Sequence, residues 1–297
     1  MGLSGDSGGC PRIISPMPEQ VTFVSRLQHR WQQSDSLICV GLDPDPARIP
    51  PSLGSEPQAV VSFCRQVIDA TAPYVCAFKP QAAYFGALGL EDELAALVSY
   101  VHERHPDIPV ILDAKRGDIG ATARLYAVEA FERYGADAVT VNAYMGYESL
   151  APYLEYADKG IFVLCRTSNA GSGWLQSFPD DDPTYLRVAR EVVSWNAAGN
   201  VMLVAGATYP EELGRIRGVV GDMPLLVPGI GAQGGDLVQV LNNGADAAGR
   251  GLIINAARSV LFAGSGDDFA AASSAAARDL RDQVRTLQRT DRAHAKN

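Results

Sequence analysis

The densest group of reactive side chains follows a short apolar run and reads Asp113-Ala114-Lys115-Arg116-Gly117-Asp118. If Asp113 and Lys115 end a β-strand, they share a face, because strand side chains alternate with a period of two. Asp118 then falls in the loop or first helical turn beyond. An ammonium between carboxylates stays protonated, since nearby negative charge favours its charged form. The spacing predicts a lysine that donates a proton rather than one that forms a Schiff base. The alternative is a surface charge run in which Asp118 serves a helix N-terminus.

A second group of residues is suited to binding phosphate. Residues 228–236 read PGIGAQGGD, and Gly249-Arg250-Gly251 follows a later apolar run. Glycine lets backbone N–H groups approach an anion closely, and a guanidinium makes paired, charge-assisted hydrogen bonds to its oxygens. A glycine-rich loop alone is most often a tight turn, so the prediction depends on its combination with Arg250.

Eight short apolar runs must position these groups. Most are continuously apolar, which is typical of strands buried on both faces of a parallel sheet. Helical spacing fills the intervals, so the chain is predicted to be a single-domain α/β protein, a (β/α)8 TIM barrel. A doubly wound sheet is the alternative, because the eighth run is weak.

The runs are Leu37–Leu42, Tyr74–Phe78, Pro109–Leu112, Ala138–Val141, Gly160–Cys165, Val201–Ala205, Pro224–Val227 and Ala245–Gly249. The expected helices include Gln58–Thr71, Glu91–Arg104, Thr122–Tyr134, Asp182–Asn200 and Glu211–Gly218.

The polar residues that follow these runs would meet at one end of such a barrel, where its reactive groups lie. Asp43 before Pro44 alone could be a turn residue, and Lys79 before Pro80 alone could be a strand end that reaches solvent. Together, two carboxylates, two lysines and two arginines converge on one face. They are Asp43, Lys79, Asp113, Lys115, Arg166 and Arg250, with Asn142 and Ser168 beside them.

The domain boundaries follow from composition. Residues 1–18 are expected to form a flexible leader, and residues 19–297 the barrel with its C-terminal helix. The alanine-rich segment Asp267–Gln288 predicts that helix, followed by a frayed tail. Arg166–Asp182, rich in Gly, Ser, Asn and Asp, is predicted to be a long loop able to close over a ligand.

Composition excludes several classes of protein. The chain has 297 residues, 34 Asp plus Glu against 25 Lys plus Arg, and a net charge of −9. This balance argues against a nucleic-acid binder, since phosphate contacts need a basic surface. The longest uncharged stretch, Val192–Pro210, is too polar to span a bilayer, and the N-terminus lacks the pattern of a secretory signal. We therefore expect neither nucleic acid nor membrane as a partner.

Cysteine and histidine narrow the chemistry further. Five cysteines, widely spaced and without a Cys-x-x-Cys pair, favour a reducing cytoplasm. The four histidines lie in polar segments away from the apolar strand ends, which argues against Ser-His-Asp hydrolysis and against histidine-rich zinc sites. They are His29, His102, His105 and His294.

These segments together resemble the orotidine 5′-monophosphate decarboxylase family, in particular its longer bacterial and mycobacterial-type branch. The resemblance runs from the first predicted strand to the eighth, in the family's order, and the D-x-K-x-x-D segment is its signature. Ala143 and Ala170 stand where proline is expected, which bears on loop stiffness more than on chemistry. The matching segments are LDPD at 42–45, FKPQAAYF at 78–85, LDAKRGDIGATA at 112–123, TVNAYMG at 140–146, CRTSNAGS at 165–172, GATYPEEL at 206–213, PGIGAQGGD at 228–236 and GRGLI at 249–253.

The resemblance implies decarboxylation of orotidine 5′-monophosphate to uridine 5′-monophosphate, the last step of de novo pyrimidine synthesis, without metal or cofactor. It implies that Asp113 lies next to the substrate carboxylate and that Lys115 protonates C6 of the pyrimidine. It also implies that Lys79 completes the charge array and contacts the ribose, and that Asp43 binds a ribose hydroxyl. It further implies an obligate homodimer with shared active sites. Asp118 and Thr122 would reach the partner's site, Ser168 would bind the pyrimidine, and Gln233 and Arg250 the phosphate. Arg258 is the competitor of Arg250, which is preferred because it ends the predicted strand.

Two rival functions remain at this level. One is a sugar-phosphate decarboxylase or aldolase that shares the D-x-K-x-x-D segment but uses Mg²⁺; the TSNAG and PGIGAQGGD loops favour the nucleotide enzyme. The other is a silent nucleotide-phosphate binding protein on the same barrel. A mere binder has no need to crowd carboxylates beside an anionic ligand, which favours an enzyme.

Overall fold

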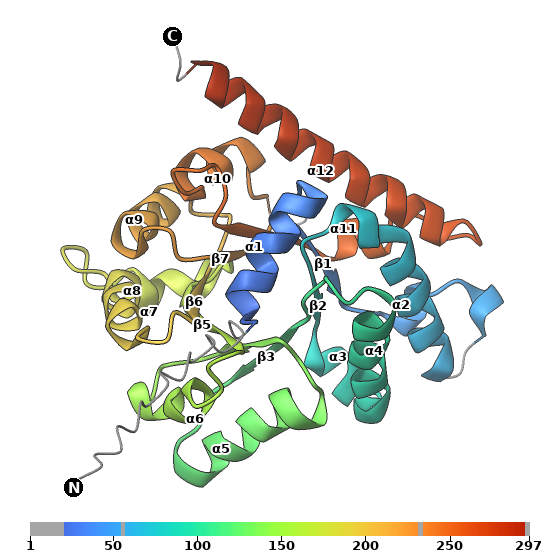
Figure 1. Ribbon diagram of the computed structural model, residues 1–297, viewed down its shortest axis with the longest axis horizontal. Helices are drawn as coiled ribbons and strands as arrows, with labels where there is room; N and C mark the ends of the chain where they lie inside the picture. The colour runs from blue at the N-terminus through green and yellow to red at the C-terminus, as the bar shows by residue number, and fades with distance from the viewer. Residues whose placement is uncertain (1–20, 55–56, 231–233, 295–297) are drawn as a thin grey trace, which may run out of the picture.

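The computed structural model describes residues 21–54, 57–230 and 234–294, and eight parallel strands form its single sheet (Figure 1). Their order is β2-β1-β8-β7-β6-β5-β4-β3, and parallel bridges from Phe78 to Val110 and from Gln81 to Asp113 join the two edges. The sheet is therefore a nearly closed barrel. The strands are β1 (Ile38–Leu42), β2 (Ala77–Pro80), β3 (Ile111–Arg116), β4 (Ala138–Val141), β5 (Gly160–Arg166), β6 (Val201–Ala205), β7 (Leu225–Pro228) and β8 (Leu252–Ala256).

Helices follow the strands and surround the barrel (Figure 1). The buried faces of the helices and the continuously buried strands form one hydrophobic core. The helices are α1 (Phe23–Ser34), α2 (Pro57–Thr71), α3 (Ala82–Gly86), α4 (Glu91–Arg104), α5 (Gly120–Val128), α6 (Ala151–Leu154), α7 (Gly173–Gln176), α8 (Thr184–Trp195), α9 (Pro210–Val220), α10 (Leu237–Gly244), α11 (Arg258–Leu261) and α12 (Phe269–His294). A π-helical turn, Glu129–Arg133, continues α5, and short 3-10 turns lie at Pro46–Arg48, Pro51–Leu53, Ala72–Tyr74, Tyr147–Ser149 and Ala170–Ser172.

Helix α1 covers the end of the barrel at which the strands begin. In Figure 1 it crosses the middle of the ring of strands. The backbone N–H of Phe23 donates to the carbonyl of Asp158 at 2.8 Å, and the Phe23 ring packs edge-on against Phe162. A side chain at Gly160 would overlap the Phe23 ring, so the glycine is required for this close approach. The chemistry is left to the opposite end, where the strands finish.

The predicted TIM barrel is confirmed, and the doubly wound alternative is wrong. The first seven predicted runs overlap β1–β7, but the eighth prediction is wrong, because β8 is Leu252–Ala256 rather than Ala245–Gly249. The latter is a turn in which the Asp246 carboxylate accepts from the backbone N–H of Ala248 and Arg250, and Gly249 and Gly251 have positive φ. The strand begins only where β-branched isoleucines replace alanine. Arg250 therefore precedes β8.

The C-terminal helix forms as expected and extends beyond its predicted end. Helix α12 packs against α2 and α10, and Arg285 donates to the carbonyls of Ser34 and Asp35. These contacts attach the end of the chain to α1 and hence to the base of the barrel. The expected leader, residues 1–18, lies outside the described residues.

Candidate active site

A cavity of about 380 Å³ lies where the strands end, within the size range of small-molecule sites. Every strand except β6 supplies a polar side chain or a flanking loop residue to it, and β6 contributes the apolar Val204. Its lining residues are Asp43, Lys79, Gln81, Asp113, Lys115, Thr140, Leu164, Thr167, Ser168, Asn169, Val204, Leu226, Pro228, Gly229, Ile230, Asn255, Ala257, Arg258 and Ser259.

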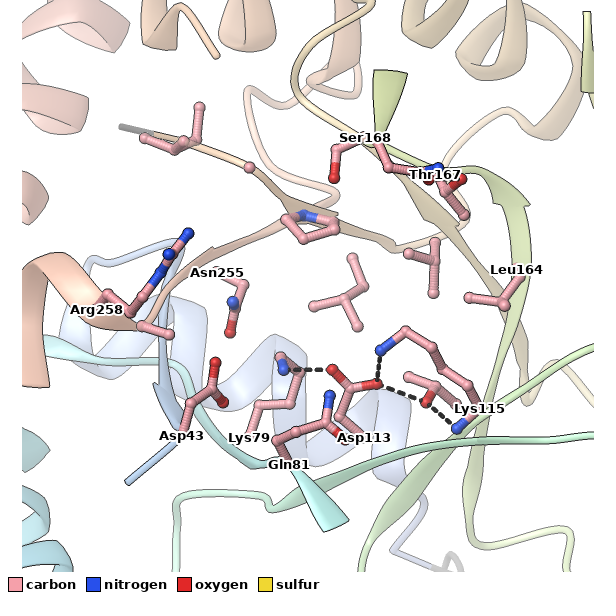
Figure 2. A pocket seen from close by; sticks show the side chains of 18 of the residues that line it. Asp43, Lys79, Gln81, Asp113, Lys115, Leu164, Thr167, Ser168, Asn255 and Arg258 are labelled. Carbon is pink, nitrogen blue, oxygen red and sulfur yellow. Dashed lines mark hydrogen bonds and ion pairs between the residues drawn. The ribbon is translucent and has the colours of Figure 1, made fainter. Parts of the chain in front are cut away.

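A row of alternating charges crosses the floor of this cavity (Figure 2). Lys79 Nζ lies 2.6 Å from Asp113 Oδ2, and Lys115 Nζ lies 2.5 Å from Asp113 Oδ1. The Lys79 and Asp113 residues are only 3% and 6% exposed, whereas the Lys115 side chain is 45% exposed. The carboxylate is therefore fixed between two ammonium groups, of which only the second is open to a ligand.

The backbone reaches this arrangement through a break in β3. Its register against β4 shifts between Leu112 and Arg116, and Lys115 has a φ of +50°. Thr140 Oγ1 accepts from the N–H of Ala114 and Lys115 and donates to Asp113 Oδ1 at 2.9 Å. A left-handed non-glycine residue costs free energy, and such strain is typical of functional sites. Asp113 and Lys115 do meet, but through this break rather than through simple strand alternation.

Electrostatics keep the Lys79 and Asp113 side chains ionised. Burial acts to raise the pKa of the Asp113 carboxyl, but the Lys79 and Lys115 ammonium groups outweigh it and hold that pKa well below its ordinary value. Burial likewise acts to lower the pKa of Lys79, but Asp113 and Asp43 raise it above the ordinary lysine value. At neutral pH the floor therefore presents fixed charges that need no reorganisation during a reaction.

Asp43, at the end of β1, differs from Asp113. Burial raises the pKa of its carboxyl, and the nearby Lys79 only partly offsets this. No described residue donates to its buried Oδ1. A buried oxygen without a donor costs free energy unless a ligand or water supplies the hydrogen bond. Asp43 is therefore placed to accept from a bound hydroxyl.

The segment after β5 forms one wall of the cavity. Ser168 lies there as the sequence predicts, together with Thr167 and Asn169. Thr208 Oγ1 donates to the carbonyl of Ser168 at 3.0 Å. A Cβ at Gly206 would lie 2.7 Å from the Ser168 nitrogen, so only glycine lets β6 approach this segment so closely.

Arg166 and Gln176 hold the same wall from behind. The buried Arg166 guanidinium contacts the carboxylate of Glu212, the hydroxyl of Ser172 and the ring of Tyr209. Gln176, on α7, accepts from the Thr167 N–H at 2.8 Å and donates to Thr167 Oγ1 at 2.9 Å. The beginning of the predicted loop Arg166–Asp182 is thus a fixed wall, and the segment contains α7 and a 3-10 turn.

The phosphate prediction needs a correction. Arg250 lies at the beginning of β8, the end of the barrel away from the cavity, because the strand starts after it. Arg258, which follows β8 at the start of α11, lines the cavity and is exposed. Pro228, Gly229 and Ile230 also line it, whereas Gln233 lies outside the described residues.

Asp118 and Thr122 are not brought into this cavity. Asp118 Oδ1 accepts from the N–H of Ile119 at 2.8 Å, and Thr122 is exposed on α5. Both lie on the outer surface of the chain, next to the exposed side chains of Ile119 and Leu125.

Sequence reasoning missed Gln81, Thr140, Gln176 and Asn255. Thr140 and Asn255 are polar residues inside otherwise apolar strands, which is a usable signal, but Asn255 was lost with the misplaced eighth strand. Among residues 21–54, 57–230 and 234–294, no group of three or more His, Cys, Asp or Glu side chains is arranged to hold a metal ion.

The fold and site define a (β/α)8-barrel enzyme whose cavity combines a Lys–Asp–Lys row with an arginine. Residues 36–274 match the family model described as Orotidine 5'-phosphate decarboxylase / HUMPS family, and the chain belongs to this family. It is 58% identical over 265 residues to the orotidine 5'-phosphate decarboxylase of Azoarcus sp., covering 88% of this chain and 98% of the relative. The corresponding protein of Aromatoleum aromaticum is 56% identical over 266 residues, covering 88% of this chain and 98% of the relative.

Solved structures agree with the relatives. The structure of Leishmania donovani OMP decarboxylase superposes with a TM-score of 0.80 at 38% identity and covers 90% of this chain and 99% of that one. The resemblance drawn from the sequence motifs is confirmed, and with it the decarboxylation of orotidine 5′-monophosphate to uridine 5′-monophosphate in pyrimidine biosynthesis.

Proposed function

We propose that the row Lys79–Asp113–Lys115 carries out this carboxy-lyase reaction, with Lys115 as proton donor. The observation that carries the proposal is the Asp113 carboxylate fixed between two ammonium groups, one buried and one open to the cavity. A nucleotide-binding site alone would gain nothing from a buried carboxylate that repels an anionic ligand.

The electron balance of the reaction fits this row. The bond from C6 to the carboxylate breaks, CO₂ leaves, and the electron pair stays in an in-plane orbital at C6 that ring resonance cannot absorb. Stabilisation must come from a fixed positive charge nearby, and the Lys115 ammonium supplies it. A proton then moves from Lys115 Nζ to C6, which forms uridine 5′-monophosphate. Asp113 would lie beside the substrate carboxylate, and Lys79 holds Asp113 in place.

Substrate binding is assigned to the residues around the row. Asp43 would accept from a ribose hydroxyl, Ser168 would bind the pyrimidine, and Arg258 would bind the phosphate in place of Arg250, with Gln233 as its predicted companion. Binding energy from the remote phosphate can be used to close loops and to order the reacting groups. Segment 166–182 is proposed to take part in that closure beyond its fixed first residues. Removing the phosphate from the substrate should then greatly lower kcat/KM.

We further propose that the chain acts as a homodimer with shared sites. Large apolar side chains are exposed on α5 and on the neighbouring segment after β4, close to Asp118 and Thr122. Contiguous exposed apolar surface typically marks a protein interface. In a dimer through this face, Asp118 and Thr122 would reach the partner's cavity, since neither reaches its own. The exposed residues are Ile119, Leu125, Tyr144, Met145 and Tyr147.

Location and other partners follow the sequence prediction. Cys39, Cys64, Cys76 and Cys165 are buried free thiols, which fits the proposed reducing cytoplasm. None of the helices in the described ranges is long and apolar enough to cross a membrane. The acidic charge balance supports the absence of a nucleic-acid partner.

The decisive assay follows the ultraviolet absorbance of orotidine 5′-monophosphate with the purified protein, before and after treatment with EDTA. We expect full activity in both conditions. Loss of activity with EDTA, restored by Mg²⁺, would favour the metal-dependent sugar-phosphate class instead. Tight binding without turnover would favour the silent binding protein.

A further inference from the structure

Asn255 is a buried polar residue whose hydrogen bonds are incomplete. It lies near the end of β8, pairs in register with Cys39 of β1 and Pro228 of β7, and lines the cavity. It is only 8% exposed, and no described residue donates to its buried Oδ1. A polar atom this buried needs a hydrogen-bond partner to offset the free energy of its lost hydration.

Among the described residues that line the cavity, Asp43 shares this deficiency. Figure 2 shows the Asn255 amide and the Asp43 carboxylate pointing toward one another across the cavity floor, away from the Lys115 end of the row. Asp43 Oδ1 is also buried and has no donor. Two acceptor oxygens that face each other cannot form a hydrogen bond, so one of the two positions must be taken by a donor.

The amide itself can supply that donor. A carboxamide carries its acceptor and its donor at opposite ends, and its terminal torsion is broadly two-fold. Of the two polar atoms of the Asn255 amide, Oδ1 is buried without a partner and Nδ2 is not. A half-turn therefore brings Nδ2 toward Asp43 and moves the oxygen to the more accessible side. Gly41 leaves room for the amide, since a Cβ there would lie 3.1 Å from Asn255 Oδ1.

We propose that Asn255 is a positioning residue for the sugar-binding carboxylate: its Nδ2 donates to Asp43 Oδ1 and holds that carboxylate ionised and aimed at a sugar hydroxyl. This role rests on the proposed function, in which Asp43 accepts from the substrate. The charged groups facing Asp43 are Lys79 from β2, Asp113 and Lys115 from β3, and Arg258 from α11. Asn255 would add a neutral donor to these charged groups.

The test compares Asn255→Leu, which keeps the size but has no hydrogen bond, with Asn255→Asp, which replaces the donor by an ionisable acceptor. We measure kcat/KM for orotidine 5′-monophosphate between about pH 5 and 9. Asn255→Leu should lose about 10- to 100-fold, mostly through KM, the effect of one hydrogen bond to a charged group. The acid limb of its profile should move to higher pH, because the pKa of Asp43 rises without a donor.

Asn255→Asp should lose more than Asn255→Leu at neutral pH and recover on the acid side. Two neighbouring carboxyls share one proton there, and the protonated one donates to the other. Wild-type kcat/KM with an unshifted acid limb in Asn255→Leu would overturn the proposal, as would equal, pH-independent losses in both variants. If Asn255→Leu does not fold, the acid recovery of the nearly isosteric Asn255→Asp decides alone.

A binding comparison separates this proposal from the proposed function. The dissociation constants of UMP and of its 2′-deoxy and 3′-deoxy analogues are measured by calorimetry. In the wild type, the analogue that lacks the hydroxyl donating to Asp43 should have a higher dissociation constant than UMP. In Asn255→Leu this difference, the penalty for losing the hydroxyl, should be smaller. An unchanged penalty overturns the role of Asn255 even in an active enzyme, whereas an inactive wild type with the expected penalties overturns only the proposed function.

Discussion

The two ends of the barrel each bury a carboxylate, and they use it differently. At the base, Asp137 accepts from the Arg26 guanidinium, from His102 Nε2 at 2.8 Å and from the Val110 N–H at 2.8 Å. At the mouth, Asp113 contacts two lysines and Thr140. Both carboxyls have a lowered pKa, so neither burial nor ionisation distinguishes the structural carboxylate from the one proposed to be catalytic.

The difference lies in what surrounds each carboxylate. Asp137 is enclosed by protein donors and by α1, which makes its hydrogen bonds complete within the chain. Beside Asp113, the Lys115 side chain is 45% exposed with left-handed backbone, and Asp43 and Asn255 have oxygens without donors. Strain and unmade hydrogen bonds lower stability, and they persist where a ligand completes them. The comparison predicts that changes at the mouth reduce activity and changes at the base reduce stability.

The largest expected effect is that of Lys115→Ala. Loss of both the stabilising charge and the proton donor should lower kcat/KM by at least about 10⁴-fold. Because the side chain is half-exposed and its backbone is strained, the free energy of unfolding should change little. Steady-state kinetics and chemical denaturation measure the two quantities, and Arg190→Ala, which removes an exposed ion pair to Asp182, is the surface control.

Asp137→Asn should show the opposite pattern. Removing the buried charge of Asp137 leaves the part-buried Arg26 and His102 without their partner, which should cost about 1 to 3 kcal/mol of unfolding free energy. The kcat of the folded fraction should stay at the wild-type value, because Asp137 lies at the far end of the strands. Urea denaturation with parallel kinetics checks this. A large loss of kcat without loss of stability would contradict the division between the two ends.

Arg258→Ala and Arg250→Ala form a matched pair that separates the two candidates for phosphate binding. Arg258→Ala should lower kcat/KM for orotidine 5′-monophosphate by about 100-fold, the effect of charge-assisted hydrogen bonds. Arg250→Ala should leave it unchanged, since that side chain lies before β8. Neither variant should alter the rate with phosphate-free orotidine. The reverse order of the two effects would restore the original sequence prediction.

Acid should remove the stabilising contribution of the Asp137 carboxylate at the base of the barrel. Burial acts to raise the pKa of Asp137, but His102 and Arg26 hold it below the ordinary value. A lowered carboxyl pKa contributes stability above the unfolded pKa of about 3.9, and this stability is lost as pH falls through the folded value. The stability difference between wild type and Asp137→Asn should therefore shrink below about pH 4. Denaturation curves over a pH series measure it, and a difference that grows toward acid would be inconsistent with the ion pair.

The smallest effect is expected from Gln176→Leu, which removes two neutral hydrogen bonds to Thr167. The two bonds contribute about 1 kcal/mol each, so kcat/KM should fall by up to about 30-fold as the wall around Ser168 loosens. The pH profile should keep its shape, because no charge changes. Gln176→Glu keeps the acceptor for the Thr167 N–H and should recover part of the loss. A shift of the acid limb in Gln176→Leu would show that the wall is coupled to the charge row.

The barrel was predictable because continuous apolar runs alternate with helical segments, a pattern that few folds share. The one misplaced strand shows the limit: Ala245–Gly249 is apolar in composition but closes a turn on Asp246, and the isoleucines that form β8 come later. Because of that error, Arg250 was predicted to bind the phosphate, and Asn255 was not recognised as a residue near the end of a strand. An error of a few residues in the position of one strand therefore assigned Arg250 to the wrong end of the barrel.

The charge row was predictable from the spacing of Asp113 and Lys115, but its geometry was not. Strand alternation alone would give the shared face, whereas the structure uses a register shift, a left-handed Lys115 and the hydroxyl of Thr140. These depend on the neighbouring strand, which no local pattern in residues 111–116 encodes. The Arg166 contact with Glu212 is equally non-local, because α9 lies far along the chain.

The most direct test measures kcat/KM for orotidine 5′-monophosphate and the unfolding free energy side by side in wild type, Lys115→Ala and Asp137→Asn. The account predicts opposite outcomes for the two variants. Lys115→Ala loses activity with near wild-type stability, and Asp137→Asn loses stability with wild-type kcat. Full decarboxylation by a folded Lys115→Ala variant would contradict the assignment of the mouth as the catalytic end.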